Sequence, residues 1–453
     1  MGKLFGTDGI RGVANQELTP ELAFKMGRIV AFLLGSEGPP PHTRRRFFLL
    51  GRDTRLSGSM LEGALTAGIT STGMDVQLLG VLSTPAVAYL SARLGAAGAV
   101  MISASHNPVG DNGLKFFNGQ GFKLRSEQEK EAEKLYFQEE DPSPRPTGMD
   151  IGRSWHAEEA LEDYLSFMKK NAPPLQDLRI VLDCANGSLA GIAPSFFREL
   201  GAEVFPYNSI PDGEKINVNC GSTNPSLLQE AVREKRAHLG LAFDGDGDRL
   251  IAVDEKGEVV DGDAIMAVCA SYLKEKNRLR GNKIVATVLS NGGLDLAGAE
   301  KGFAVLRTKV GDRYVFEEMQ RGGYVLGGEQ SGHIIFGDLL PTGDGLLTSL
   351  QLLRVMVEKS APLSSLAAIM IRLPQLQVNC PVENKSGWET NPRINASIKQ
   401  VGEKLGNKGR VLVRASGTEP LIRIMLEGQN DTLLQELSQV LAKVIKQEMG
   451  ALS

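Results

Sequence analysis

The fold class is indicated most clearly by one stretch, Gly98-Ala-Val-Met-Ile-Ser-Ala-Ser-His-Asn-Pro-Val-Gly-Asp-Asn-Gly-Leu-Lys-Phe-Phe117. It opens with a run of apolar residues, Gly98 to Ile102, which is typical of a buried strand. Polar side chains follow at once, and Pro108 stops regular strand pairing. We therefore expect Ser105 on a tight, exposed loop at the end of a strand, which is where active sites collect in an open parallel sheet.

Ser105 is the candidate reactive residue of this loop. His106 follows it directly, and the turn-forming residues Gly110-Asp-Asn-Gly113 return Lys115 toward the same place. A serine beside a histidine and a lysine is a candidate nucleophile or phosphate carrier. The segment alone is equally compatible with a polar loop whose serine only caps a helix.

The composition is that of a globular protein with no bulk basic character. The 453 residues are 42% hydrophobic and 23% charged, and the net charge is -4. Nucleic acid is therefore not an expected partner. The four cysteines are scattered without metal-ligand or redox spacing, and no apolar run reaches the length of a membrane span. We expect a cytoplasmic protein with no membrane partner.

Strands and helices alternate along most of the chain. Thr19 is expected to cap a helix over 19–34, and Thr84 a helix that ends at Leu94. Further helices are expected over 57–72 and 157–170. The alternation predicts an α/β fold of three similar domains with mixed, mainly parallel sheets and a smaller C-terminal α+β domain. The expected domain boundaries are 1–155, 156–254, 255–373 and 374–453.

A second chemical site is Phe243-Asp-Gly-Asp-Gly-Asp-Arg249. The carboxylates of Asp244, Asp246 and Asp248 repel one another unless a cation joins them, and the glycines let the backbone curl around one hard cation such as magnesium. An EF-hand is the competing interpretation, with Glu255 at its twelfth position. It is disfavoured because Arg249 stands where that loop needs glycine.

Two further loops carry polar groups suited to a phosphosugar. Gly327-Gly-Glu-Gln-Ser-Gly-His333 offers a carboxylate, a hydroxyl and an imidazole for sugar hydroxyls, and Lys309-Val-Gly-Asp-Arg313 adds charge nearby. Arg414-Ala-Ser-Gly-Thr-Glu-Pro420 joins two expected strands. Its arginine, hydroxyls and amides can cradle a phosphate, although an ordinary hairpin loop would look similar.

These four loops, in this order, resemble those of the α-D-phosphohexomutase superfamily over essentially the whole chain. The opening Phe5-Gly-Thr-Asp-Gly-Ile-Arg-Gly12 is expected to be a glycine-rich loop. This segment and the glutamine of Gly-Glu-Gln-Ser-Gly-His333 are most similar to the bacterial subfamily that acts on glucosamine phosphates. One departure is Gly35–Arg46, which looks like a longer surface loop than that subfamily carries. Mutases for mannose or glucose phosphates remain an alternative, as does a metal-regulated binding protein.

The resemblance implies four domains arranged around a central cleft. It also implies an isomerase that interconverts glucosamine 6-phosphate and glucosamine 1-phosphate. Ser105 would be a phosphoserine that shares one Mg²⁺ per active site with the three aspartates. Glucosamine or glucose 1,6-bisphosphate would serve as intermediate or activator, and a homodimer is possible. The implied roles of the remaining residues are orientation or neutralisation of the transferring group (Arg11, His106, Arg249), acid/base work (Lys115, His333), sugar binding (Glu329, Ser331, Asp312) and phosphate binding (Arg414, Ser416, Gly417, Thr418).

Overall fold

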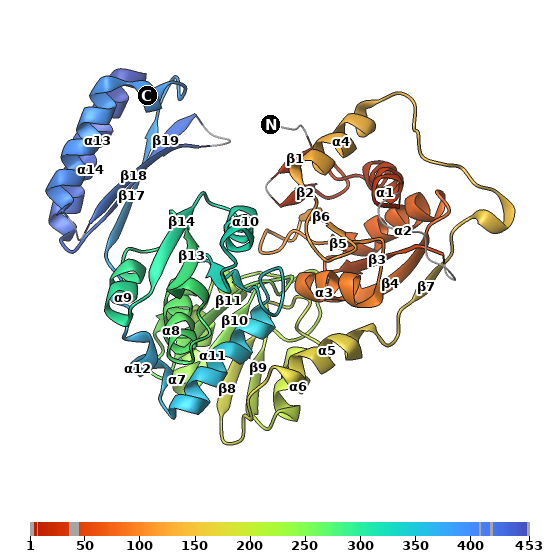
Figure 1. Cartoon of the computed structure of the whole chain (residues 1–453), viewed down its shortest axis with the longest axis horizontal. Helices are drawn as coiled ribbons and strands as arrows, with labels where there is room; N and C mark the ends of the chain where they lie inside the picture. Colours follow the sequence, from red (N-terminus) through yellow and green to blue (C-terminus); the bar gives the residue numbers. More distant parts are fainter. Residues whose placement is uncertain (1–3, 7, 36–44, 407–408, 417–419, 451–453) are drawn as a thin grey trace. The chain divides into compact units, whose positions relative to one another are not determined.

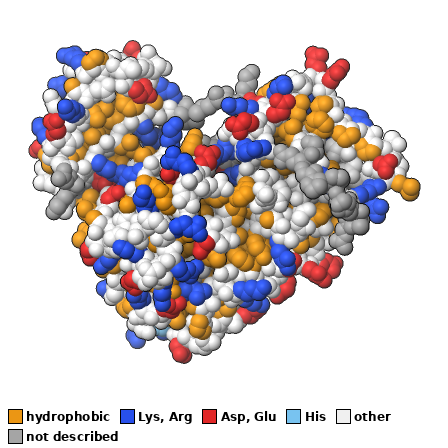
Figure 2. Space-filling model, viewed as in Figure 1, with side chains coloured by type: hydrophobic (Ala, Val, Ile, Leu, Met, Phe, Trp, Pro, Cys, Tyr) orange, Lys and Arg blue, Asp and Glu red, His pale blue; other side chains and the backbone are white. Residues whose placement is uncertain are grey.

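A computed structural model describes residues 4–6, 8–35, 45–406, 409–416 and 420–450. The chain forms two compact units. The first comprises Met1–Val288 and Leu306–Ala368, and the second comprises Leu289–Val305 and Ile369–Ser453. Most of the Gly35–Arg46 loop lies outside the described residues. Charged side chains of both signs are interspersed over the visible face (Figure 2). Among the described residues, no helix is long and apolar enough to cross a membrane.

The first sheet has seven strands in the order β1-β2-β6-β5-β3-β4-β7 (Figure 1). Its parallel part carries β5, whose end leads into the serine loop, and the antiparallel part follows on one side. The strands are β1 Phe5–Gly6, β2 Gly9–Val13, β3 Phe47–Arg52, β4 Asp75–Val81, β5 Gly98–Ile102, β6 Asp111–Asn118 and β7 Ser154–His156. The helices of this part are α1 Pro20–Gly35, α2 Ser57–Thr70, α3 Thr84–Leu94 and α4 Ser126–Phe137.

Two segments expected as loops are strands instead. Most of the Phe5–Gly12 segment forms β1 and β2, and Asp111–Gly113 belongs to β6. Glycine content misled the prediction, because β2 and β5 lie on either side of β6 and satisfy its backbone groups. The pairing sets Lys115 opposite Met101, so sheet register and not a turn delivers the lysine to the serine loop.

Helix starts follow local chemistry with one correction. Thr19 caps α1 as expected, accepting a hydrogen bond from Leu22 N at 3.3 Å. The cap of α3 is Ser83, whose hydroxyl accepts from Ala86 N, and not Thr84. Thr84 is the first residue of the helix, and its hydroxyl donates to Asp246 of the Asp244–Asp248 segment. The Thr84 hydroxyl, which the sequence predicted to cap the helix, therefore bonds to a residue remote in sequence.

The second and third sheets repeat the α/β pattern, with strand orders β12-β11-β10-β8-β9 and β14-β13-β15-β16. Their strands are β8 Arg179–Asp183, β9 Glu203–Tyr207, β10 Leu239–Phe243, β11 Leu250–Asp254, β12 Val259–Val260, β13 Lys283–Thr287, β14 Ala304–Thr308, β15 Leu326–Gly328 and β16 Ile334–Phe336. Their helices are α5 Ala160–Lys170, α6 Ala193–Glu199, α7 Ser226–Lys235, α8 Gly262–Glu275, α9 Gly293–Lys301, α10 Asp312–Gly322, α11 Gly345–Lys359 and α12 Leu363–Ala367.

The C-terminal part of the second unit is a small α+β structure. Its antiparallel sheet has the order β17-β19-β18, from Gln375–Pro381, Leu421–Glu427 and Arg410–Ala415. Helices α13 Pro392–Leu405 and α14 Asp431–Met449 pack on it. Buried aliphatic residues of these helices and of β19, such as Ile394, Ile424 and Leu441, form a separate core, which is how the sequence pattern of alternating strands and a terminal helix is satisfied.

The close packing of α1 on α2 is testable through two glycines of α2. A Cβ on Gly68 would lie 2.3 Å from the main-chain oxygen of Phe24, whereas nothing lies within 4 Å of a Cβ on Gly63. We expect Gly68→Ala to lower the free energy of unfolding by about 2 kcal/mol, because the helices must separate. Gly63→Ala should raise it by up to about 1 kcal/mol through helix propensity. Urea unfolding measures both, and equal effects would contradict the packing.

Candidate active site

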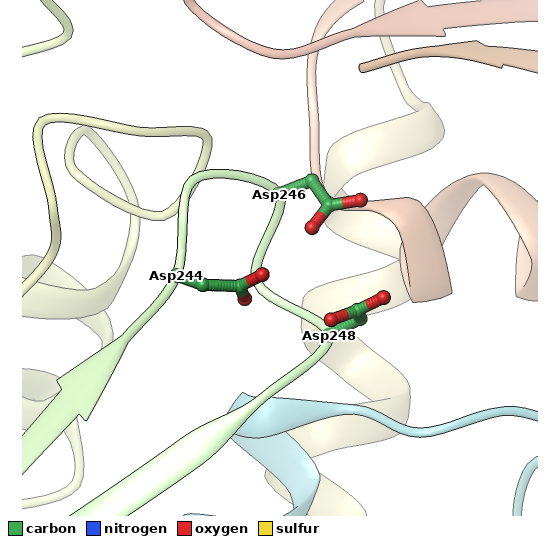
Figure 3. Close-up of side chains that lie close together, drawn as sticks. All are labelled: Asp244, Asp246 and Asp248. Carbon is green, nitrogen blue, oxygen red and sulfur yellow. The ribbon is translucent and has the colours of Figure 1, made fainter. Parts of the chain in front are cut away.

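Three buried aspartates lie on the loop that joins β10 to β11. The strands pair antiparallel up to Phe243 and Leu250, so Asp244, Asp246 and Asp248 occupy the tight connection between them. One carboxylate oxygen from each lies within 4.8 Å of the others. Figure 3 shows the three side chains close together on this loop. All three side chains are buried. The arrangement expected from the Asp-Gly-Asp-Gly-Asp spacing is therefore present.

The three carboxylates of this loop repel one another. Burial and the charges of Asp248 and Asp246 raise the pKa of Asp244 well above its usual value. Burial alone would also raise the pKa of Asp248, but Lys115 and His333 hold it well below its usual value. Two carboxylates so close together cannot both stay ionised at low free-energy cost unless positive charge is added.

The donor set fits a hard divalent cation. Asp246 Oδ1 and Asp248 Oδ1 are buried and have no hydrogen-bond partner among the described residues. An all-oxygen set with free lone pairs is what Mg²⁺ requires. The EF-hand alternative is excluded, because both flanking elements are strands and Glu255 instead accepts hydrogen bonds from Ser364.

Ser105 lies directly against this loop. Its Oγ donates to Asp244 Oδ2 at 2.6 Å and lies 3.3 Å from His106 Nδ1. Ser105 itself is only 1% exposed, so the expectation that this serine would be exposed was wrong, whereas Pro108 and Gly110 of the same loop are exposed. The burial comes from a segment remote in sequence: Asn217 donates to the Ser105 carbonyl at 2.8 Å, and Gly245 approaches so closely that a Cβ there would lie 2.7 Å from that oxygen.

Lys115 reaches the same carboxylates from β6. Its Nζ lies 2.8 Å from Asp246 Oδ2, 3.1 Å from Asp8 Oδ2 and 3.4 Å from Asp248 Oδ2. Burial alone would lower the pKa of Lys115, but these carboxylates raise it well above its usual value. The geometry therefore favours a permanent ammonium ion that neutralises the cluster over a group that exchanges protons with a sugar.

A cavity of ≈ 520 Å³ opens beside the cluster, which is within the usual size of small-molecule sites. Its lining includes Arg11, His106, Asp248, Arg249, Asp312, Glu329 and His333, together with residues of β1 and β2. Burial, followed by the charges of Arg249 and Arg11, lowers the pKa of His106 to about 4, so its imidazole is neutral at pH 7. These seven predicted site residues therefore lie around one cavity.

Both ring nitrogens of His333 have polar neighbours. Its Nε2 accepts a hydrogen bond from Gly343 N at 3.1 Å, and its Nδ1 lies 3.5 Å from Asp248 Oδ2. These contacts orient the ring toward the aspartate loop. Glu329 lines the cavity and accepts from Gly311 N, whereas Ser331 is exposed and is not among the cavity-lining residues.

The predicted phosphate loop belongs to the second unit. Arg414 lies on β18 directly opposite Arg423 of β19, and burial followed by the charge of Arg423 lowers the pKa of Arg414. Like charges opposite each other in a sheet repel, which favours an anion between or beside them. Lys385 Nζ donates to the Ser416 carbonyl at 2.7 Å. Gly417 and Thr418 lie outside the described residues.

Sequence reasoning missed several charged residues that support the site. Lys123 forms ion pairs with both Asp8 and Asp312, which connects the first sheet to α10. Asp8 stands in the quoted opening segment, and Arg11, three residues away, is one of its ion-pair partners. Arg423 could have been found, because it is the one charged residue in the apolar run Leu421–Leu426 after the predicted phosphate loop.

Four family models match the chain in order. They are the domains I, II, III and IV of phosphoglucomutase/phosphomannomutase, the first three described as alpha/beta/alpha, at residues 2–143, 159–257, 261–373 and 378–444. The chain therefore belongs to the phosphoglucomutase/phosphomannomutase family, and it is a mutase, an isomerase that moves a phosphoryl group.

Two individual relatives have the name phosphoglucosamine mutase. The chain is 52% identical to phosphoglucosamine mutase of Bacillus cereus over 452 residues, with both chains fully covered. It is also 52% identical to phosphoglucosamine mutase of Desulforudis audaxviator, covering 99% of this chain and 100% of that one.

Solved structures show the same fold at lower identity. A phosphoglucomutase/phosphomannomutase family protein of Burkholderia thailandensis matches with a TM-score of 0.83 at 24% identity, covering 100% and 99% of the two chains. N-acetylphosphoglucosamine mutase of Aspergillus fumigatus, in complex with GlcNAc-6P and magnesium, matches with a TM-score of 0.69 at 17% identity, covering 99% and 96%.

The cation site can be tested without turnover. We expect Asp246→Asn to weaken Mg²⁺ binding by at least about 10-fold, since even outer-shell partners of a metal contribute that much. Asp254→Asn is the matched control, because it removes the same charge from a buried aspartate that only caps the turn after β11. Isothermal titration calorimetry with Mg²⁺ measures both. Equal affinities of the two variants would argue against the aspartate loop as the cation site.

Proposed function

We propose that this chain is a phosphoglucosamine mutase that interconverts glucosamine 6-phosphate and glucosamine 1-phosphate, and so supplies an activated amino sugar for UDP-N-acetylglucosamine and cell-wall precursors. Full-length relatives of that name at about 52% identity support the substrate. The observation that carries the mechanism is the 2.6 Å contact between Ser105 Oγ and Asp244 in a cluster of three buried carboxylates. A binding protein would not need a hydroxyl in that position.

Ser105 is proposed to carry a phosphoryl group in the resting enzyme. The 1-hydroxyl oxygen of glucosamine 6-phosphate attacks the phosphorus, the bond from phosphorus to Ser105 Oγ breaks, and the 1,6-bisphosphate forms. The sugar hydroxyl gives up one proton and Ser105 Oγ takes one up, so the step conserves protons. After the bisphosphate turns over in the cavity, Ser105 Oγ gives up its proton and attacks the 6-phosphorus. The bond from that phosphorus to sugar O6 breaks, O6 takes up a proton, and glucosamine 1-phosphate and phosphorylated Ser105 result.

Charge neutralisation is the main task of the surrounding residues, as expected for phosphoryl transfer. Asp244, Asp246 and Asp248, with Ser105, would hold one Mg²⁺. When bound, the ion neutralises charge on the transferring phosphoryl oxygens. Arg11 and Arg249 line the cavity and add fixed positive charge. His106, neutral and 3.3 Å from Ser105 Oγ, is suited to orient that oxygen.

Proton transfer to and from the sugar hydroxyls needs an acid/base group near the cavity. Lys115 and His333 are the candidates predicted from sequence. Their contacts favour different duties: Lys115 stabilises the aspartate cluster as an ammonium ion, and His333 positions Asp248. Substitutions of either should therefore alter cation binding as well as turnover.

Sugar and phosphate recognition would be divided between loops. Glu329 and Asp312 line the cavity and are proposed to contact sugar hydroxyls, with Ser331 as a further candidate. Arg414, Ser416, Gly417 and Thr418 are proposed to hold the phosphate that is not reacting, with Arg423 beside them. We further propose that the chain has the four domains 1–155, 156–254, 255–373 and 374–453. We also propose a cytoplasmic homodimer that a glucosamine or glucose 1,6-bisphosphate activates.

The phosphoserine mechanism predicts the outcome of one substitution. We expect freshly purified protein to carry one phosphate that maps to Ser105, and Ser105→Ala to lose at least about 1,000-fold in kcat, because no other step replaces a lost nucleophile. Intact-mass measurement, phosphopeptide mapping and an assay on glucosamine 6-phosphate check this. Turnover by a protein without phosphate on Ser105 and without bisphosphate primer would sink the mechanism.

Substrate preference is a separate prediction. We expect kcat/KM for glucosamine 6-phosphate to exceed the values for glucose 6-phosphate and mannose 6-phosphate by at least about 10-fold, since one well-placed polar contact to the 2-amino group contributes that much. The three sugars are compared with the same primed enzyme. A larger kcat/KM for mannose or glucose phosphate would assign the chain to the alternative phosphomannomutase or phosphoglucomutase activity.

A further inference from the structure

The main chain of Ser105 adopts an unfavourable conformation. Its φ is +53°, in the left-handed region that residues other than glycine rarely occupy. In this conformation its Oγ lies 2.6 Å from Asp244 Oδ2. Since an isolated serine would prefer other backbone angles, surrounding interactions must hold Ser105 where its oxygen meets the aspartate loop.

A chain of buried hydrogen bonds begins at the amide of Ser105. Ser105 N donates to Ser103 Oγ at 2.9 Å, and the Ser103 hydroxyl donates to Asp53 Oδ2 at 2.6 Å. Arg55 completes the chain: its Nε donates to Asp53 Oδ2 at 3.0 Å, and its main-chain N donates to Asp53 Oδ1 at 2.9 Å. The groups of this hydrogen-bond series are all paired with one another, so the series has one preferred geometry.

The guanidinium of Arg55 also grips the serine loop directly. Its two Nη atoms donate to four main-chain carbonyls, those of Ser105 at 3.1 Å, Asn107 at 2.8 Å, Asp111 at 2.9 Å and Pro108. The planar, five-donor guanidinium is the side chain best suited to hold several oxygens at fixed angles. One side chain therefore sets the path of the loop from Ser105 to the start of β6.

These supporting side chains are buried: Asp53 and Ser103 are 0% exposed and Arg55 is 1% exposed. Their hydrogen bonds join them to one another and to the main chain of the loop that carries Ser105. We therefore expect them to affect the reaction through the position of Ser105.

We propose that Asp53, Arg55 and Ser103 are positioning residues, which hold Ser105 Oγ at the aspartate loop for phosphoryl transfer. The inference rests on the proposed role of Ser105 as the phosphate carrier. It also assigns the second hydroxyl of the loop: Ser103 Oγ is engaged on both sides, by Asp53 and by the Ser105 amide, and so serves as a support and not as a second nucleophile.

The decisive comparison is Arg55→Lys against Arg28→Lys. Arg28 is also 1% exposed, and its guanidinium likewise bonds to an aspartate and to main-chain carbonyls, but it lies in α1, away from the serine loop. Lysine keeps the charge and loses the multiple contacts. We expect Arg55→Lys to lower kcat about 100-fold with KM changed by less than about threefold, because a displacement near 1 Å costs that much. Arg28→Lys should lower the melting temperature and leave kcat unchanged.

A second pair of variants tests the same positioning role if Arg55→Lys does not fold. Ser103→Ala should lower kcat at unchanged KM, whereas Ser91→Ala, which removes an equally buried hydroxyl bonded to the Asn118 carbonyl, should not. Both are assayed with glucosamine 6-phosphate and glucose 1,6-bisphosphate, with melting temperatures measured alongside. Folded Ser103→Ala and Arg55→Lys with unaltered kcat would overturn the positioning role. Absence of phosphate and activity in the unsubstituted protein would instead overturn the proposed function.

Discussion

The structure depends on the burial of three carboxylates within 4.8 Å of one another. Taking such a cluster out of water is costly, and positive charge must offset the repulsion. Lys115 supplies part of that charge from β6, and Arg249 supplies more from the aspartate loop itself. The requirement ties the first sheet to the second, because one supplies the ammonium ion of Lys115 and the hydroxyl of Ser105 while the other supplies the carboxylates.

Close approach of loops is the second requirement, and it explains where small and polar residues occur. Gly245 lets the aspartate loop reach the Ser105 carbonyl, and Asn217 adds a donor to the same oxygen. Arg55 satisfies the remaining carbonyls of the serine loop. Buried main-chain groups need hydrogen-bond partners. These bonds let the chain leave β5 and turn at Ser105, whose φ is positive, with the Ser105 carbonyl buried. They also restrict the position of Ser105 Oγ.

Several features could be predicted because they depend on neighbours in sequence. The start of α1 follows from Thr19 and Pro20, and the aspartate spacing itself indicated a cation site. Predictions failed where a remote segment competed for the same group. Thr84 was expected to cap a helix but bonds to Asp246, and Ser105 was expected at the surface but is buried beneath Asn217 and Gly245. Local patterns contain no information about such partners.

The sequence by itself determined the family, the order of the four loops and the identity of the reactive serine candidate and its aspartates, because motif chemistry and residue spacing are local properties of the chain. Only the tertiary structure decided what surrounds them. It placed Lys115 among carboxylates that raise its pKa, enclosed His333 between Asp248 and Gly343, and joined Asp53 and Arg55 to the serine loop. The physical reason is that charge state, burial and hydrogen-bond geometry depend on residues brought together by folding.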